Sequence, residues 1–385
     1  MNCFALFFFR ETIPPSLALP GCSLFVSLNE GPHAAILKNW TRSFKNQYNQ
    51  GMRKFIIALV LLLGVLYIIT RFTEVQDLYA TLQRGDWRFI LLGFATVGLW
   101  MANHGLSYQA VYRLLGIREE MWHMMKVALA ADFVNVVTPS AGMTTIAVFL
   151  DDSRRRGYSS GRVMVAWALN LLFDYTAFLG VLTVGLGVLA RRNDLHWPEI
   201  TAACILLLGA LGLATLLYLG LQSGEALGKA LAWMARIINR IVRPFIHRDY
   251  LEVERAHSFA HDGAAGIATV RQNPSGLLKP ILLALSNKAL LILMLMLTFM
   301  AFHVPYTSGT IVAGFSIGYL FLIVSPTPSG IGIVEGVLTL ALTSLWVPVE
   351  AAAIITLVYR GFTFWLPLFV GMVAFRQMPH ENQIA

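Results

Sequence analysis

The sequence predicts an all-α integral membrane protein, in which about six full spans plus two re-entrant helical hairpins form inverted repeats. Hydrophobic residues make up 57% of the 385 residues and charged residues only 13%, whereas charged residues make up about 25% of an ordinary soluble domain. Several apolar runs reach the about 20 residues that a bilayer crossing needs. Two further apolar runs are each interrupted by the same helix-breaking motif.

The first fifty residues differ from the rest of the chain. Proline and glycine interrupt their short apolar runs at Pro14-Pro15, Pro20-Gly21 and Gly31-Pro32. A basic head, Met52-Arg53-Lys54, then precedes the apolar run 55–70, as is typical of the start of an inner-membrane protein. We therefore expect residues 1–51 to be a poorly ordered or untranslated extension. A cleaved signal peptide is disfavoured, because Phe4–Phe9 comes before its basic residue.

The remaining apolar runs divide into full spans and broken segments. The predicted full spans are 55–70, 88–112, 163–190, 200–221, 280–302 and 351–375. The segments 123–150 and 309–346 each contain a Thr-Pro break near the middle, so we interpret them as re-entrant hairpins. These eight helical membrane segments form a polytopic domain over residues 52–378, which is followed by a tail at 379–385.

The basic residues support this topology. If the first hairpin enters and leaves on one side, the basic residues between the membrane segments fall on the cytoplasmic face of the bacterial inner (plasma) membrane, with both termini. These residues are Arg53, Lys54, Arg113, Arg118, Lys126, Arg154, Arg155, Arg156, Arg162, those of the loop 222–279, and Arg376. A full crossing by 123–150 would put Arg154–Arg156 outside, and only Arg191-Arg192 stand against the rule. This sorting explains the formal charge of +8, so no nucleic-acid partner is implied.

Within the loop, the segment 222–276 contains an amphipathic pattern. Its apolar face consists of Leu227, Leu231, Met234, Ile238, Ile241 and Phe245. Its basic face consists of Lys229, Arg236, Arg240, Arg243 and His247. The pattern fits a helix that lies on anionic lipid headgroups, and the alternative is a loop helix packed on the bundle.

The same count of crossings puts the second hairpin on the opposite face from the first, which predicts inverted repeats. The spans that follow the hairpins support this interpretation, because Leu169–Phe178 aligns without a gap on Ile355–Phe364. In this alignment Asp174 and Arg360 occupy matching positions.

The two breaks share a motif that fits the start of a half-helix. They read Thr138-Pro139-Ser140-Ala141-Gly142 and Thr327-Pro328-Ser329-Gly330-Ile331-Gly332. Threonine serves as an N-cap, and proline at the first helical position lacks the N–H that would be left without a partner. The residues that follow then offer free N–H groups at the positive end of a helix dipole, which attract phosphate or carboxylate. The alternative is that proline and glycine only kink the helices for packing.

Ionisable residues inside the membrane segments are the next candidates. A charge at a helix centre costs about 2.5–3.5 kcal/mol, so Asp132, Asp174, Glu335 and Arg360 should face the protein interior. Arg360 is the candidate phosphate clamp, because a guanidinium is always charged and grips two oxygens at once. The alternative is a structural ion pair of Arg360 with Asp174 or Glu335, and the two roles can coexist. Glu335 is the candidate for a coupled protonation.

Other polar residues complete this part of the prediction. Asn170 precedes Asp174 by one turn and Thr356 precedes Arg360 by one turn, so each helix presents a polar pair on one face. Lys288 is expected to snorkel to the interface. Asn103 and His104 either line the cavity or form hydrogen bonds in the packing.

Enzyme signatures are missing from the sequence. It has no Walker loop, nucleotide-binding glycine fingerprint, Gly-x-Ser-x-Gly elbow or zinc cluster. Cys3, Cys22 and Cys204 have no metal-ligand spacing. We therefore expect a protein that is not an enzyme and that uses no cofactor and no metal.

Several of these residues together resemble a known family. Asn135–Gly142, Asp174, Ser325–Gly336 and Tyr359-Arg360 are similar to the flippase-like membrane domain of lysylphosphatidylglycerol synthases, a resemblance that covers about residues 52–378. It implies an inner-membrane protein that handles an anionic or aminoacylated phospholipid, or another polyprenyl or hopanoid lipid. This chain lacks the soluble aminoacyl-transfer domain of the full synthases, so lipid aminoacylation is not implied. The first motif departs from the family, because Ala141-Gly142 replaces the expected double glycine.

Two functions are consistent with these features. The first is a flippase-like transporter that translocates an anionic or phosphate-bearing lipid between the leaflets of the plasma membrane. The alternative is a non-transporting accessory membrane protein that binds lipid or partners a lipid-modifying or glycosyltransferase enzyme. The expected partner is a membrane phospholipid or another phosphate-bearing lipid, with a second copy of the chain or a membrane enzyme as further partners.

Overall fold

The computed structural model describes residues 85–138, 143–191, 197–222 and 274–378, together with residues 225, 228–230 and 233. All regular secondary structure in these residues is helical, as the sequence predicts. Four regions named above lie outside the described residues wholly or almost wholly. They are the extension 1–51, the first span 55–70, the amphipathic segment 222–276 and the tail 379–385.

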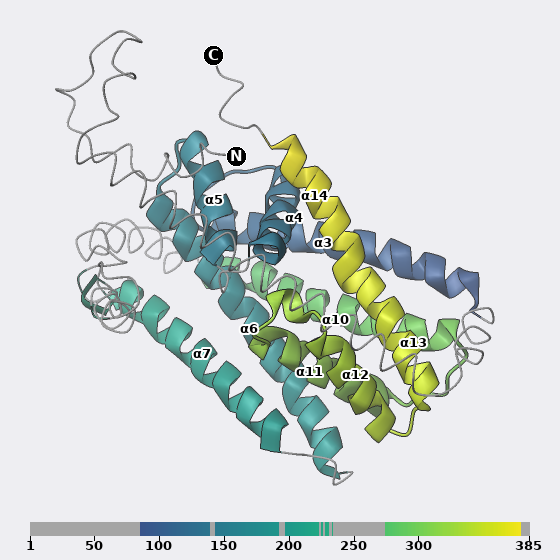
Figure 1. Ribbon diagram of the computed structural model, residues 1–385. Helices are drawn as coiled ribbons and strands as arrows, with labels where there is room; N and C mark the ends of the chain where they lie inside the picture. Colours follow the sequence, from purple (N-terminus) through teal and green to yellow (C-terminus); the bar gives the residue numbers. More distant parts are fainter. Residues whose placement is uncertain are drawn as a thin grey trace, which may run out of the picture. The chain divides into compact units, whose positions relative to one another are not determined.

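Five helices of the described chain are long and apolar enough to cross a membrane, and they correspond to five of the predicted spans. They are α3 (Trp87–Leu114), α6 (Ser160–Arg191), α7 (Trp197–Gln222), α10 (Leu278–Ala301) and a continuous helix of three parts. The three parts are α13 (Val349–Arg360), the π-helical turn η6 (Gly361–Trp365) and α14 (Leu366–Gln377). Figure 1 shows α7 alongside α6 and α10 alongside α3, and each of these pairs is in contact.

Local sequence explains where α3 begins and ends. Asp86 Oδ1 accepts a hydrogen bond from the N–H of Arg88 at 2.9 Å and so caps the first turn. At the other end Gly116 has a φ of 77°, and its N–H bonds back to the carbonyl of Arg113. Glycine adopts this left-handed conformation without a steric cost, so the helix stops there.

The two segments with Thr-Pro motifs are broken into shorter helices, as predicted. The segment 123–150 forms α4 (Met121–Val137) and α5 (Met143–Arg155). The segment 309–346 forms α11 (Ser308–Val324), the short 3-10 turn η5 (Pro328–Gly330) and α12 (Ile333–Ser344). None of these helices has more than 17 residues, so each is shorter than the about 20 residues that a full crossing needs.

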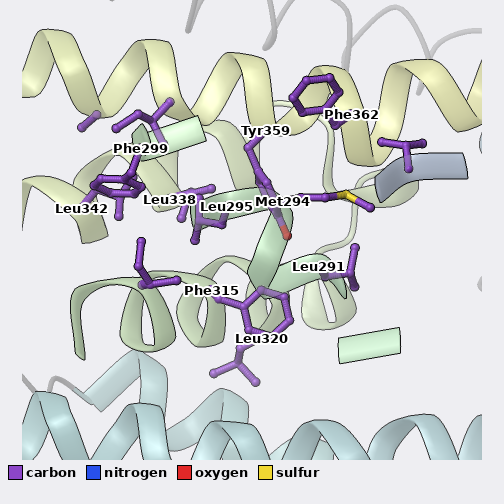
Figure 2. Packing of buried hydrophobic residues seen from close by; sticks show 14 of the residues in the cluster. Leu291, Met294, Leu295, Phe299, Phe315, Leu320, Leu338, Leu342, Tyr359 and Phe362 are labelled. Carbon is purple, nitrogen blue, oxygen red and sulfur yellow. The ribbon is translucent and has the colours of Figure 1, made fainter. Parts of the chain in front are cut away.

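The second broken segment is fixed in place by the largest core cluster. Figure 2 shows Leu291, Met294, Leu295 and Phe299 of α10 packed among Phe315 and Leu320 of α11, Leu338 and Leu342 of α12, Tyr359 of α13 and Phe362 of η6. Most of these side chains are completely buried. Because this packing joins α11 and α12 to the helices that come before and after them, α10 and α13, it holds α11 and α12 against the long helices that carry Lys288 and Arg360.

A second core cluster gathers the helix ends that carry the basic residues. It joins Leu114 at the end of α3 with Phe149 of α5, Val163 at the start of α6 and Leu217 near the end of α7. Met378, just after α14, packs against the same cluster. The helix ends that bear Arg113, Arg154, Arg162 and Arg376 therefore lie together, as the positive-inside argument requires, whereas Arg191 is at the opposite end of α6 from Arg162.

Two glycines lie where helices approach each other closely. A Cβ on Gly371 of α14 would collide with the carbonyl oxygen of Leu129 in α4. A Cβ on Gly185 of α6 would meet the side chain of Ser316 in α11, because it would lie only 2.5 Å from the Cβ of Ser316. Small residues allow this kind of close backbone packing in membrane proteins.

Replacing Gly371 with alanine is expected to destabilise the protein by about 1–3 kcal/mol, because the new methyl group forces α14 away from the backbone of α4. The measurement is the thermal unfolding midpoint in detergent. The matched control is Gly187→Ala, since a Cβ at Gly187 meets nothing within 4 Å. Equal midpoints for the two variants would contradict the close contact between α14 and α4.

Candidate functional site

A cavity of about 270 Å³ lies between the helices, and three of the predicted substrate-binding residues, Asp174, Ser329 and Arg360, line it. It is lined by residues from α3, α4, α6, α10, α11, α12 and α13–α14 and by the turn at the second motif. Its polar and charged lining consists of Trp100, His104, Tyr108, Asp132, Asn135, Trp167, Asn170, Asp174, Asn287, Tyr319, Ser329, Tyr359, Arg360 and Thr363. The predicted polar pair of Asn170 and Asp174 is confirmed as a shared face, because both residues line this cavity.

Arg360 is held in the cavity wall by two hydrogen bonds. Its Nε donates to Glu335 Oε1 at 2.7 Å, and its Nη2 donates to the carbonyl oxygen of Ser329 at 2.9 Å. The ring of Phe364 lies 4.7 Å from the guanidinium carbon. Arg360 is 3% exposed, so its orientation is fixed by the protein. Of the two ion pairs that the sequence left open, Arg360 forms the one with Glu335.

The third nitrogen of the guanidinium, Nη1, remains available. Within the described chain no hydrogen bond from Nη1 accompanies those from Nε and Nη2, and Arg360 lines the cavity. The side chain therefore presents one edge of a fixed cation to whatever enters the cavity. Arg360 also directly precedes the π-helical turn η6, a local irregularity that is frequent at functional sites.

The second motif differs from the predicted half-helix start. Thr327 and Pro328 do begin a helical turn, but it is only the three-residue η5, and α12 begins at Ile333 after Gly332. Positive φ angles of 49° at Ser329, 72° at Gly330 and 82° at Gly332 turn the chain between η5 and α12. Ser329 faces the cavity and fixes Arg360 through its carbonyl.

The prediction of free N–H groups at this motif is wrong at three positions, Gly330, Ile331 and Gly332. The N–H of Ile331 bonds to the carbonyl of Pro328 at 3.2 Å. The N–H of Gly332 donates to Glu335 Oε2 at 2.7 Å, and the N–H of Gly330 bonds to the carbonyl of Thr327. Glu335 therefore caps its own helix with one carboxylate oxygen and binds Arg360 with the other.

The first motif is only partly described. Thr138 ends α4, where its N–H bonds to the carbonyl of Val134 at 2.8 Å. Pro139, Ser140 and Gly142 lie outside the described residues. Asn135, one turn before Thr138, lines the cavity, so the end of α4 contributes to the site.

Lys288 does not snorkel, and this prediction is wrong. The lysine side chain is 1% exposed, and its Nζ lies 2.6 Å from Asp174 Oδ1. Tyr319 completes the group, since its hydroxyl accepts a hydrogen bond from Lys288 and donates one to Asp174 Oδ2 at 3.2 Å. Asp174 lines the cavity and is 23% exposed. The polar centre thus consists of two separate ion pairs, Asp174 with Lys288 and Arg360 with Glu335. Asp174 and Arg360, which the predicted alignment matches, each belong to one of them.

One wall of the cavity is formed by α3 with α10. Trp100 and His104 stack one turn apart on α3, and the ring of Tyr108 follows edge-on one turn later. Asp132 of α4 lies 3.5 Å from His104 Nε2, lines the cavity and is 48% exposed. Asn103 has a packing role, because its Nδ2 donates to the carbonyl of Leu283 at 3.0 Å.

A second hollow, of about 860 Å³, lies at the basic helix ends. Arg156 organises it by donating to both carboxylate oxygens of the buried Glu119, at 3.2 and 2.9 Å, and to His123 Nδ1 at 3.0 Å. Arg113 and Arg118 also line it. The contact with Glu119 raises the pKa of Tyr158. Three of the arginines predicted on the cytoplasmic face therefore gather at one place.

The chain is similar to known membrane proteins over most of its length. The family model described as "Lysylphosphatidylglycerol synthase TM region" matches residues 55–371. A protein named "UPF0104 membrane protein", from Methanothermobacter thermautotrophicus, is 23% identical over 331 residues, which are 85% of this chain and 95% of that protein. The matched range includes the cavity, both motifs and the two ion pairs.

Proposed function

Since the chain belongs to the lysylphosphatidylglycerol synthase TM-region family, we propose that it is a flippase-like transporter, which moves an anionic, phosphate-bearing lipid between the leaflets of the plasma membrane. The observation that carries this proposal is the fixed orientation of Arg360 in the cavity wall. Two of its guanidinium nitrogens are fixed by Glu335 and Ser329, while Arg360 lines a cavity among apolar helices. A guanidinium fixed in this way is a strong partner for phosphate oxygens. The activity involves no covalent step, so the protein is proposed as a transporter and not an enzyme.

The size of the cavity limits the size of the lipid headgroup. About 270 Å³ is just below the range of about 300–1,000 Å³ that encloses drug-sized ligands. The cavity therefore suits a phosphate with a small substituent and not an oligosaccharide. The acyl chains would remain in the apolar surroundings between the helices, where their transfer costs little.

Inverted repeats are part of this proposal, because transporters built from such repeats carry their sites at the repeat interface. The gapless alignment that pairs Asp174 with Arg360 also pairs Gly185 with Gly371. Both glycines make a close helix contact, Gly185 with α11 and Gly371 with α4. Each contact joins the span of one repeat to the helix that precedes the Thr-Pro break of the other. This reciprocal arrangement supports a duplication with eight membrane segments.

The proposed topology puts both termini in the cytoplasm and the two hairpins on opposite faces. In a variant whose native cysteines are replaced by serine, Arg154→Cys is expected to be protected from impermeant thiol reagents in intact cells, and Ser344→Cys is expected to be labelled. Both positions are exposed on the protein, so the membrane alone decides access. Labelling of both positions from outside would exclude the inverted hairpins.

Transport itself is tested with purified protein in lipid vesicles that contain a fluorescent phosphatidylglycerol. The protein should make label from the inner leaflet accessible to an impermeant quencher, with and without an imposed proton gradient. Protein-free vesicles and vesicles with Arg360→Lys protein are the controls. Binding of the lipid without any movement between leaflets would instead favour the non-transporting accessory role.

A further inference from the structure

The wall formed by α3 and α10 contains buried polar atoms that have no partner in the described chain. Trp100 Nε1, His104 Nε2 and Asn287 Oδ1 belong to cavity-lining residues, and none of these atoms makes a hydrogen bond there. His104 Nε2 lies 3.5 Å from the carboxylate of Asp132, which leaves Trp100 Nε1 and Asn287 Oδ1 as the two unpartnered atoms. Asn287 is 6% exposed. A buried polar atom without a partner costs about 1–3 kcal/mol, so a pair of them in one cavity wall points to a ligand that supplies the missing bonds.

These two residues belong to α3 and α10, which pack against each other. Ser286 Oγ donates to Asn103 Oδ1 at 2.9 Å, and Asn103 Nδ2 donates to the carbonyl of Leu283. Asn287 follows Ser286 directly in α10, and Trp100 lies one turn before Asn103 and His104 in α3. The α3–α10 contact therefore brings Trp100 and Asn287 to the same cavity wall.

The donor or acceptor character of the two atoms indicates which ligand group could bind both of them. The indole Nε1 of Trp100 can only donate a hydrogen bond, and the Oδ1 of Asn287 can only accept one. A phosphate oxygen accepts but cannot donate, and an ammonium donates but cannot accept. A hydroxyl group does both. We propose that the cavity binds a free hydroxyl group of the lipid headgroup between Trp100 and Asn287, while the phosphate of the same headgroup binds Arg360.

Charge supports this division of the cavity. Asp132 and Asp174 also line it, and their carboxylates disfavour a second phosphate while accepting hydrogen bonds from hydroxyl groups. Lys288 neutralises Asp174, which weakens the attraction of that carboxylate for an ammonium. The inference rests on the proposed function, because it assigns the rest of a headgroup whose phosphate is held by Arg360.

The test compares three short-chain lipids that have identical acyl chains and differ in headgroup. They are phosphatidate, phosphatidylglycerol and phosphatidylethanolamine, and the measurement is their dissociation constant for the purified protein by calorimetry. Phosphatidylglycerol, whose headgroup alone carries free hydroxyls, is expected to bind at least about tenfold more tightly than the other two, the usual discrimination from a pair of buried hydrogen bonds. Trp100→Phe and Asn287→Leu are each expected to remove most of this preference and to leave phosphatidate affinity unchanged.

Trp167→Phe is the matched control, because Trp167 lines the same cavity but its indole nitrogen is not among the unpartnered buried atoms. It should keep the preference for phosphatidylglycerol. Equal affinity of the parent for phosphatidate and phosphatidylglycerol, or tighter binding of phosphatidylethanolamine, overturns the hydroxyl site. If Arg360→Lys then still weakens all three lipids, the proposed function stands without this inference. If none of the three lipids binds the parent protein, both proposals fail together.

Discussion

An Arg360→Lys protein is expected to fold but to lose most phosphate-lipid binding and transport. A lysine ammonium can reach Glu335, but it cannot also bind the Ser329 carbonyl and present a further N–H to the cavity, as the planar guanidinium does. Arg360→Ala should be more severe for stability. It leaves the buried carboxylate of Glu335 unpaired, which costs about 3–5 kcal/mol. The measurements are the unfolding midpoint and transport in vesicles.

The double variant Arg360→Met with Glu335→Gln separates a binding role from a structural one. Glutamine keeps an oxygen that can accept the bond from the Gly332 N–H, and no charge remains buried, so most of the stability should return. Transport should not return, because the cation is gone. Glu350→Gln, on the same helix but outside the cavity lining, is the control. Transport by the double variant at the parent rate would show that Arg360 and Glu335 form a purely structural pair.

Asp174→Ala is expected to destabilise the protein about as strongly as Arg360→Ala, by about 3–5 kcal/mol. The change leaves the ammonium of the completely buried Lys288 without its carboxylate partner. The hydroxyl of Tyr319 remains as the polar partner, which does not neutralise the charge. Denaturant or thermal unfolding in detergent measures this loss. Asp132→Asn, a change at a half-exposed carboxylate of the same cavity, should cost much less.

The double variant Lys288→Met with Asp174→Leu should recover most of this stability, since an apolar pair can replace a buried ion pair at little cost. It should also keep its affinity for phosphatidate, because Arg360 and its two partners are untouched. A double variant as unstable as Asp174→Ala would mean that Lys288 and Asp174 do not depend on each other for stability.

Features that depend on the local chain could be predicted from the sequence. The Thr-Pro motifs interrupt their helices because proline at Pro328 cannot continue a helix and glycine at Gly330 and Gly332 accepts positive φ. Asn170 and Asp174 share a face because a helix brings residues four apart together. The burial of Arg360 follows from its depth in a long apolar helix.

Features that depend on partners distant in the sequence could not be predicted. Lys288 is paired with Asp174 from another helix, and hydropathy alone gives no information about which charges meet. The capping of Gly332 by Glu335 is different, since a glutamate three residues after an N-cap is a known capping spacing. That signal was present in the sequence and would have removed the prediction of a free N–H at Gly332.

The close contacts of Gly185 and Gly371 also constrain how such a protein could open and close. Each contact ties a span of one proposed repeat to a broken segment of the other, α6 to α11 and α14 to α4. The two halves are therefore interlocked, and a rocking motion of one whole half against the other would separate both contacts at once. If the protein transports lipid as proposed, alternating exposure of the cavity would then come from smaller movements within the interlocked frame, such as a displacement of α5 while the glycine contacts stay closed.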